Sequence, residues 1–292
     1  MLAPLRSLCL SMKHFPSTLR QLYHSESQRL VIGLLRHFAW KLRSALGLFP
    51  CELRISESRF LADGPSGVPA LINLLGVYDF NNMSFVKYVL RTFGGCMVDV
   101  GANLGSYTLI AAEARKGAIV SIEPHPGTYR NLLANIRLNA CSNVVALNVA
   151  VSNADGVLTI TDIGESAINR IVAAASYDGA SVPVPCRTLD GVCEDSRVIP
   201  TLVKIDVEGH EVQVLEGFRR TSAGTEAMIV ENGESPAVLE QTTALKFLGP
   251  WYVHFGSRSF RKTPQPRAED PVFLKPQLCT RLVALGFLIE GL

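Results

Sequence analysis

One stretch constrains the fold more than any other: residues 96–106, which read CMVDVGANLGS. Its first five residues are apolar except for Asp99, as expected of a central strand that is covered on both faces. Gly101 and Gly105 then allow the backbone to turn sharply and to approach a ligand closely. Asn103 between them is the non-glycine residue type that best tolerates a left-handed backbone. The stretch therefore predicts a buried strand, a tight turn and the start of a helix.

The helix that follows is expected to run from about Tyr107 to Lys116, capped by Ser106 and ended by Gly117. Its first backbone N–H groups have no partner within the helix and would face a bound ligand. The carboxylate of Asp99 at the strand tip would repel a phosphate. The turn therefore favours a ligand that carries an ammonium or a hydroxyl group.

The next predicted strand also ends in a carboxylate. Residues 118–122 are mainly apolar and lead into Glu123 and Pro124. In doubly wound sheets, an acidic residue about 20 positions after the glycine turn binds the ribose hydroxyls of an adenosine cofactor. Asp99, the turn and Glu123 together suggest an adenosine ligand with a charged tail that is not a phosphate. S-adenosylmethionine fits this description.

Strand and helix patterns alternate through the rest of the chain, which favours a mainly parallel, doubly wound α/β sheet. One interval, 152–200, breaks the alternation and is predicted to be a β insertion over the mouth of the site. Pro183 and Pro185 favour an edge strand there. The expected strands are 96–100, 118–123, 143–151, 202–207, 227–231, 251–255 and 271–274, and the expected helices are 104–116, 127–139, 209–217 and 236–248.

A second chemical stretch, 202–211, repeats the arrangement of the first. A buried strand ends in Asp206, and Glu208 and His210 follow at the turn into a helix. Because the carboxyl ends of adjacent strands line one crevice, Asp99, Glu123 and Asp206 are expected to lie close together. Burying three carboxylates is costly unless they bind a polar or cationic group. Alternatives stay open, since Asp206 can cap a helix and His210 can be a packing residue.

Residues 1–74 are predicted to form a helical or irregular extension, and 75–292 the main domain. Within 17–46 the pattern is helical, and its apolar residues share one face. A basic amphipathic helix can lie on a membrane surface. We favour instead a helix that packs on the main domain with solvated arginines. The apolar residues of this face are Val31, Leu34, Leu35, Phe38, Leu42 and Ala45.

Composition excludes several classes of protein. The chain of 292 residues is 48% hydrophobic and 18% charged, which describes a folded domain with a large core. A net charge of +2, with no basic stripe interleaved with aromatic residues, argues against a nucleic-acid partner. The seven scattered cysteines and the lack of a secretory signal suit a cytoplasmic location. Cysteine and histidine spacing predicts no metal site, and no apolar run is long enough to predict a membrane span.

The motifs in combination resemble the FkbM family of S-adenosylmethionine-dependent methyltransferases over roughly residues 75–275. The resemblance is carried by VDVGANLGSYT at 98–108, EPHP at 123–126, CRTLD at 186–190 and KIDVEGHE at 204–211. It implies a class I methyltransferase fold, which is a Rossmann-like, seven-stranded sheet whose last strand, about 271–274, is antiparallel. It also implies O-methylation of a hydroxyl on a sugar or another small natural-product acceptor, with oligomeric state left open.

The resemblance also implies roles for individual residues. The cofactor is expected to contact Asp99, Gly101, Ala102, Asn103, Gly105, Ser106, Glu123, Pro124, Asn148 and Ala150. The candidate catalytic residues are Asp206, Glu208 and His210, with Asp206 or His210 favoured as the base that removes the hydroxyl proton. Two rival functions are kept: a nicotinamide-dependent dehydrogenase, and a cofactor-binding scaffold without catalysis. Asp99 and the absence of a third glycine at Ser106 argue against the dehydrogenase.

Overall fold

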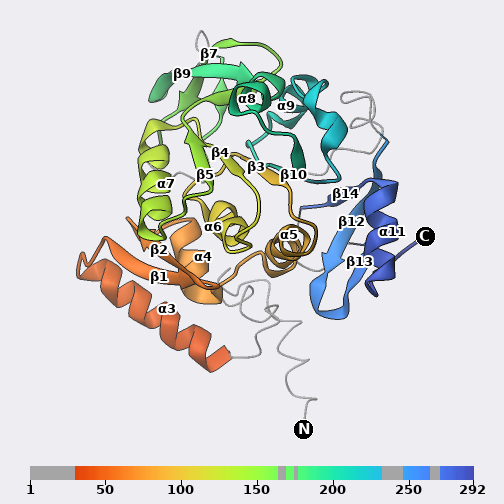
Figure 1. The fold of residues 1–292 in the computed structure, drawn as a ribbon. Coiled ribbons are helices and arrows are strands. Elements are labelled where there is room, and N and C mark those ends of the chain that lie inside the picture. The colour runs from red at the N-terminus through yellow and green to blue at the C-terminus, as the bar shows by residue number, and fades with distance from the viewer. Residues whose placement is uncertain (1–29, 164–168, 174–176, 232–245, 264–269) are drawn as a thin grey trace.

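The computed structural model describes residues 30–163, 169–173, 177–231, 246–263 and 270–292 (Figure 1). Its centre is a nine-stranded sheet with the order β15-β13-β12-β14-β11-β10-β3-β4-β5. The strands are β3 (Cys96–Val100), β4 (Ile119–Ile122), β5 (Val144–Leu147), β10 (Pro200–Ile205), β11 (Ala227–Val230), β12 (Leu248–His254), β13 (Ser259–Arg261), β14 (Val272–Leu274) and β15 (Leu288–Ile289).

Seven of these strands form the predicted doubly wound sheet. Strands β5, β4, β3, β10 and β11 pair in parallel, and β14 is antiparallel to both β11 and β12. The expectation of an antiparallel strand at 271–274 is therefore confirmed, and β13 and β15 extend the sheet beyond it. The chain order reverses between β3 and β10. In sheets of this type ligands bind at such a point, outside the carboxyl ends of the strands.

Helices cover both faces of the sheet. Side chains from α5 (Phe80–Phe93), α6 (Ser106–Ala112) and α11 (Pro276–Ala284) form one core cluster with Met97 and Ile119. Side chains from α8 (Leu189–Ser196) and α9 (Glu211–Glu216) form another with Val98 and Val100. Because strand side chains alternate between faces, Asp99 points to the same side as Met97. Another helix, α7 (Pro126–Leu138), packs near the turn after β3.

The β insertion forms a separate four-stranded sheet with the order β6-β9-β7-β8. Its strands are β6 (Ala150–Ser152), β7 (Gly156–Thr161), β8 (Ile171–Val172) and β9 (Ser181–Thr188). The single strand expected over 143–151 was wrong, because β5 ends at Leu147 and β6 joins this second sheet. The edge position expected for the strand with Pro183 and Pro185 was also wrong, because β9 lies between β6 and β7. Its two prolines are tolerated because they pair only with β7, and pairing with β6 begins at Cys186.

Several helix boundaries also differ from expectation. Helix α6 ends at Ala112, and Gly105, not Ser106, is its N-cap residue. The Ser106 hydroxyl instead lies 2.8 Å from the hydroxyl of Tyr78. Helices α8 and α11 and the helix α4 (Val68–Leu75) were not predicted. Most of the helix expected over 236–248 lies outside the described residues, and Leu248 belongs to β12.

The N-terminal part consists of α3 (Leu30–Ala45), a hairpin of β1 (Cys51–Ile55) and β2 (Ser58–Ala62), and α4. The hairpin lies against α7, and α3 packs on α4 (Figure 1). Our expectation that the apolar face of α3 packs on the main domain was wrong. Leu35, Phe38 and Leu42 are all exposed to solvent, and Trp40 from another side of the helix is buried. Within the described part of the chain, none of the helices has both the length and the apolar character needed to cross a bilayer.

A buried carboxylate ties the hairpin to the main domain. Glu113, just after α6, accepts hydrogen bonds from the hydroxyls of Ser56 (2.8 Å) and Ser58 (2.7 Å) and from the backbone N–H of Glu57 (2.9 Å). The ammonium of Lys87 in α5 lies 2.5 Å from the same carboxylate. The side chain of Glu113 is only 6% exposed, so these partners stabilise a charge that would otherwise be costly to bury.

We predict that Glu113→Ala lowers the free energy of unfolding by about 3 kcal/mol, because three hairpin donors lose their acceptor and Lys87 loses its buried partner, keeping the exposed Glu57. Chemical denaturation followed by circular dichroism measures this change. Glu52→Ala is the matched control, because it breaks an exposed ion pair with Arg59 and should cost less than about 1 kcal/mol. Equal losses for the two variants would contradict the anchoring role of Glu113.

Candidate functional site

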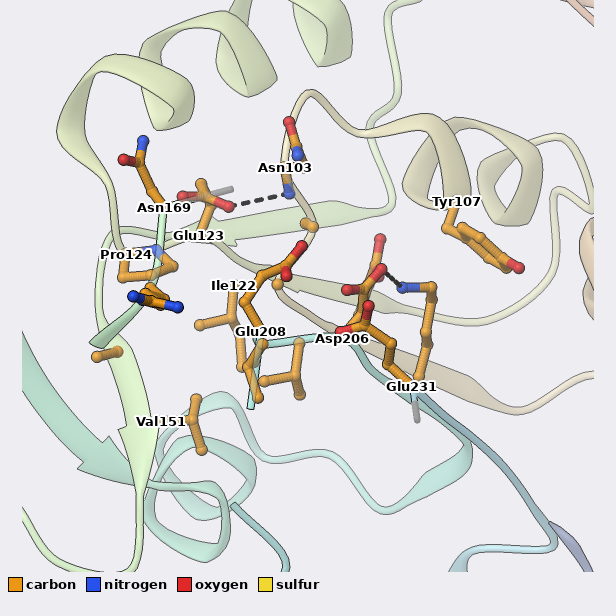
Figure 2. Close-up of a pocket in the computed structure, with 18 of the residues that line it drawn as sticks. Asn103, Tyr107, Ile122, Glu123, Pro124, Val151, Asn169, Asp206, Glu208 and Glu231 are labelled. Atoms are coloured by element: carbon orange, nitrogen blue, oxygen red, sulfur yellow. Dashed lines mark hydrogen bonds and ion pairs between the residues drawn. The ribbon is translucent and has the colours of Figure 1, made fainter. Parts of the chain in front are cut away.

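A pocket lies at the carboxyl ends of β3, β4 and β10, where the chain order reverses (Figure 2). The insertion contributes Ile160, Asn169, Arg170 and Ile171 to its wall, and α4 contributes Val68. Of the residues predicted from the sequence, those that line the pocket are Asp99, Gly101, Ala102, Asn103, Ser106, Glu123, Pro124, Ala150, Asp206 and Glu208.

The turn after β3 approaches β10 so closely that only glycine fits at its first position. Gly101 has φ +78°, and a Cβ atom there would lie 1.8 Å from the backbone oxygen of Asp206. The N–H groups of Gly101 and Ala102 donate to the carbonyl of Ile122 at 3.0 and 2.9 Å. Asn103 adopts the left-handed conformation expected of it, with φ 51°. The turn is thus held between the two neighbouring strands of β3.

Asp99 lies almost wholly inside the protein, with 1% of its surface exposed. One carboxylate oxygen accepts a hydrogen bond from the hydroxyl of Thr108 at 2.7 Å, and the other is buried without a partner among the described residues. Burial raises the pKa of Asp99, and the nearby charge of Lys204 opposes this rise. A buried acceptor without a partner, at the wall of a pocket, is suited to a donor that a ligand brings.

Glu123 is held at the opposite side of the turn by backbone donors. The N–H of Asn103 lies 3.0 Å from one of its oxygens, and the N–H of His125 lies 2.8 Å from the other. Burial raises the pKa of Glu123 to about 7, with further contributions from the charges of Asp99 and Asp206. The side chain of Asn148 donates to the backbone oxygens of Glu123 and Pro124 at 2.9 and 2.8 Å and so fixes the strand tip.

A buried lysine, Lys204, lies beside Asp206 at the end of the pocket away from Glu123. The ammonium of Lys204 lies 2.5 Å from Asp206 and 4.8 Å from the centre of the Tyr107 ring. Burial alone would lower the pKa of Lys204, but the charges of Asp206 and Asp99 outweigh it, and the pKa is raised. Conversely, burial would raise the pKa of Asp206, but the Lys204 charge holds it below its usual value. The pair is therefore ionised around neutral pH.

Glu231, directly after β11, completes this end of the pocket. Burial and the negative charge of Asp206 raise the pKa of Glu231 to about 8, and the two carboxyl groups share a hydrogen bond. The second oxygen of Glu231 is buried without a partner among the described residues. Near neutral pH, Glu231 is thus mainly protonated and Asp206 is ionised, so the two carboxyl groups together hold one proton.

Glu208 projects into the middle of the pocket, between Glu123 on one side and Asp206 and Glu231 on the other (Figure 2). Its backbone is left-handed, with φ 55°, an uncommon conformation for a residue other than glycine. Burial raises the pKa of Glu208 most, and the negative charges of Asp206 and Glu211 raise it further. Glu208 therefore combines access to the pocket with a pKa that is higher than usual for a glutamate.

Three predicted site residues do not line the pocket: Gly105, Asn148 and His210. Gly105 is the N-cap residue of α6. Asn148 lies outside the pocket lining and donates a hydrogen bond to the backbone oxygen of Glu123, just after β4. His210 is turned toward β6, where its Nε2 lies 2.8 Å from the hydroxyl of Ser152, and burial lowers its pKa. Its position favours a role in holding the turn between β10 and α9.

Sequence reasoning missed several residues that shape the site, above all Lys204, Glu231, Tyr107 and Arg170. Two of them left a signal. Lys204 is a charged residue inside an apolar strand and shares a strand face with Asp206, two positions later. Glu231 lies at the carboxyl end of a predicted strand. Asp99, Glu123 and Asp206 lie at the carboxyl ends of other predicted strands. Arg170 and Tyr107 gave no such signal, because their positions depend on how the insertion and α6 pack.

Asp206, Glu208 and Glu231 each offer a carboxylate oxygen, and these oxygens lie within 4.8 Å of one another. They are the set among the described residues that could offer oxygen ligands to a divalent cation. The ammonium of Lys204 already neutralises Asp206 at this place. The expectation that the chain has no metal site stays a prediction.

We predict that Gly101→Ala lowers the free energy of unfolding by more than about 3 kcal/mol, because its Cβ would overlap the Asp206 carbonyl and force β3 and β10 apart. Gly209→Ala is the matched control. Gly209 has a similar φ of +96° but no atom within 4 Å of a Cβ, so only backbone strain of about 1–2 kcal/mol is expected. Denaturant titration measures both, and indistinguishable losses would show that the close approach at Gly101 does not matter.

Comparison with known proteins found one curated relative and several solved structures that this chain resembles. The hexuronic acid methyltransferase AglP of Haloferax volcanii is 29% identical over 136 residues, which cover 46% of this chain and 54% of that protein. The match thus spans about half the length of this curated relative.

Among solved structures, the SAM dependent methyltransferase from Agrobacterium tumefaciens aligns with a TM-score of 0.39 and 10% identity, covering 66% of this chain and 57% of that one. TYW2 of M. jannaschii in complex with AdoMet aligns with a TM-score of 0.41 and 14% identity, covering 77% and 85%. Likenesses at this level carry no argument about function. The family model described as the methyltransferase FkbM domain matches residues 99–248, slightly more than half of the chain and the part that holds most of the pocket lining, so the chain belongs to the FkbM methyltransferase family.

Proposed function

We propose that this protein is an S-adenosylmethionine-dependent methyltransferase that methylates a hydroxyl group of a sugar. The observation that supports it most is that Asp99, the turn at Gly101 and Glu123 line one pocket, with a second group of carboxylates at its other end. The family match supports methyl transfer, and the relative named for hexuronic acid supports a sugar acceptor.

The residues present fit the proposed cofactor. The unpartnered oxygen of Asp99 is placed to accept from the α-ammonium group, directly or through water. Glu123 has acceptor capacity left for two ribose hydroxyls after its two backbone donors. An apolar wall suits the adenine ring and is formed by Ile122, Pro124, Val149, Ala150, Val151 and Ile160. When bound, S-adenosylmethionine supplies an activated methyl group on a positively charged sulfur.

The carboxylates at the other end would serve the acceptor. A sugar hydroxyl is a weak nucleophile, so its proton must leave to a base as the new C–O bond forms. Lys204 holds the pKa of Asp206 low, which makes Asp206 a weak base but a good acceptor for orienting the hydroxyl. Glu208 lines the pocket with a raised pKa and is the better base. This assignment replaces our preference for Asp206 or His210, since His210 lies outside the pocket.

A dehydrogenase is less well supported. The pyrophosphate of a nicotinamide cofactor would lie at the turn after β3, close to the carboxylate of Asp99. The buried position of that carboxylate increases the repulsion, because charges interact more strongly away from water.

We predict that S-adenosylhomocysteine binds about 10-fold more tightly at pH 8 than at pH 6. The pKa of Glu123 is raised to about 7, so Glu123 is mostly protonated at pH 6, and only its ionised form accepts from both ribose hydroxyls. Isothermal titration calorimetry across this range measures the change. Glu123→Gln should bind weakly with little dependence on pH in this window, and an unchanged pH dependence in that variant would contradict the assignment.

We predict that Glu208→Gln lowers kcat by about 10²–10⁴-fold, because the hydroxyl proton then lacks its acceptor. Affinity for S-adenosylhomocysteine should change by less than about 3-fold, since only the acceptor end is altered. His210→Gln is the control, and we expect it to lower kcat far less. The base would have to be sought elsewhere if the Glu208 variant kept its turnover or the His210 variant lost its own.

Arg170 supports an acidic sugar as the acceptor. It is an exposed cation at the pocket wall, close enough to influence the pKa of Glu208, and no ion pair joins it to a carboxylate among the described residues. A hexuronic acid carries a carboxylate that Arg170 could bind through two parallel hydrogen bonds. We therefore propose hexuronic acid residues as the acceptor class.

We predict that Arg170→Gln raises the KM for a glucuronide at least about 10-fold and leaves the affinity for S-adenosylhomocysteine unchanged. Transfer of a labelled methyl group to p-nitrophenyl glucuronide and to p-nitrophenyl glucoside measures the preference. The wild type should prefer the glucuronide and the variant should lose that preference. Equal use of both acceptors by the wild type would exclude Arg170 as the specificity residue and leave the cofactor assignment standing.

A further inference from the structure

The helix α3 presents an apolar stripe to solvent. The side chains of Leu35, Phe38 and Leu42 are 64%, 69% and 61% exposed. Leu46 extends the stripe, because its backbone N–H donates to the carbonyl of Leu42 at 3.0 Å and it is 62% exposed. Spacings of three and four residues place these four side chains on one face of a helix. We call this face the α3 stripe.

The opposite face of α3 attaches it to the protein. Gly33 and Trp40 are buried there, and the indole N–H of Trp40 donates to the carbonyl of Pro65 at 2.9 Å. Trp40 also packs edge-on against Phe49, with ring centres 5.0 Å apart. Helix α3 lies at the outer edge of the molecule, with α4 and the β1–β2 hairpin on its inner side (Figure 1). Among the α3 residues whose side chains are described, Leu35, Phe38 and Leu42 thus face away from the core.

Cations flank the α3 stripe on both sides. Arg36 and Arg43 lie on one side and Lys41 on the other, each roughly 100° around the helix from the middle of the stripe. All three side chains are exposed. The sequence has no Asp or Glu between Glu26 and Glu52, so no neighbouring acid in this stretch offsets them.

We infer that the α3 stripe docks on an anionic lipid surface, with its apolar side chains among the acyl chains and its cations at the headgroups. Long basic side chains at the border of an apolar stripe can reach headgroups while their stems stay in the apolar layer. A second copy of the chain fits less well, because its own cations would face these across the contact. The inference is independent of the proposed reaction.

Flotation of the full-length protein with vesicles tests this docking. The vesicles are phosphatidylcholine alone, or phosphatidylcholine with roughly a quarter phosphatidylglycerol, in about 0.1 M salt. Two variants remove the proposed contacts: Leu35→Ser with Phe38→Ser and Leu42→Ser, and Arg36→Gln with Lys41→Gln and Arg43→Gln. The matched control replaces three other exposed apolar residues, as Val157→Ser with Ile199→Ser and Leu288→Ser. Thermal unfolding confirms that each variant is folded.

We expect the wild type and the control to float with the anionic vesicles, and both stripe variants to bind at least ~10-fold more weakly. Raising the salt should weaken the wild type's binding. The inference is wrong if the wild type does not bind anionic vesicles, or if the serine variant binds as well as the wild type. It is also wrong if sedimentation shows a dimer of the wild type that the serine variant abolishes, because the stripe would then be a contact between copies.

Discussion

The ion pair between Lys204 and Asp206 is the interaction on which the site depends. Parallel strands bring the carboxylates of Asp99, Asp206 and Glu231 to one edge of the sheet, where burial makes their charges costly. The ammonium of Lys204, whose side chain is 4% exposed, lies among them and is 2.5 Å from Asp206. The side chain of Asp206 is 35% exposed, but removing Asp206 would leave the charge of the buried Lys204 without its nearest partner, which is strongly destabilising. Lys204 thus makes an acidic pocket compatible with a folded core.

The carboxyl groups of the pocket differ in protonation state, because Lys204 lowers the pKa of one of them and burial raises that of others. Asp206, in contact with Lys204, keeps a low pKa, whereas burial raises that of Glu231 to about 8 and that of Glu123 to about 7. A single pocket can therefore hold an ionised group, a protonated group and a group that titrates near neutrality. Such separation of pKa values is typical of sites that bind cations and move protons. One end of the pocket is thereby suited to binding the cofactor, and the other end to accepting a proton from the acceptor.

Sequence patterns predicted the central features of this fold because they are local. The strand, turn and helix at 96–106 and the carboxylates at the strand ends follow from residue type and spacing, and the structure places Asp99, Glu123 and Asp206 around one pocket. The mainly parallel sheet followed from the alternation of strand and helix patterns, whereas the antiparallel strand at 272–274 was implied only by the resemblance to the FkbM family.

Features that depend on packing could not be read from spacing. The direction of His210, turned toward Ser152, is set by the position of β6 in the second sheet. The apolar residues of α3 predicted a buried face, but Trp40 attaches the helix by another side and leaves that face outside. Ser106 had the residue type of a helix cap, yet Gly105 takes that position and Ser106 contacts Tyr78. In each case a tertiary contact overrode a sound local preference.

The most direct test of the account is thermal unfolding of the purified protein with S-adenosylhomocysteine or with NAD. A ligand that binds only the folded state raises the Tm, and the gain in stability grows with the logarithm of its concentration relative to Kd. The account predicts that S-adenosylhomocysteine raises the Tm and that NAD leaves it unchanged, because Asp99 favours an ammonium and disfavours a pyrophosphate. Stabilisation by NAD alone would contradict the proposed cofactor and with it the proposed reaction.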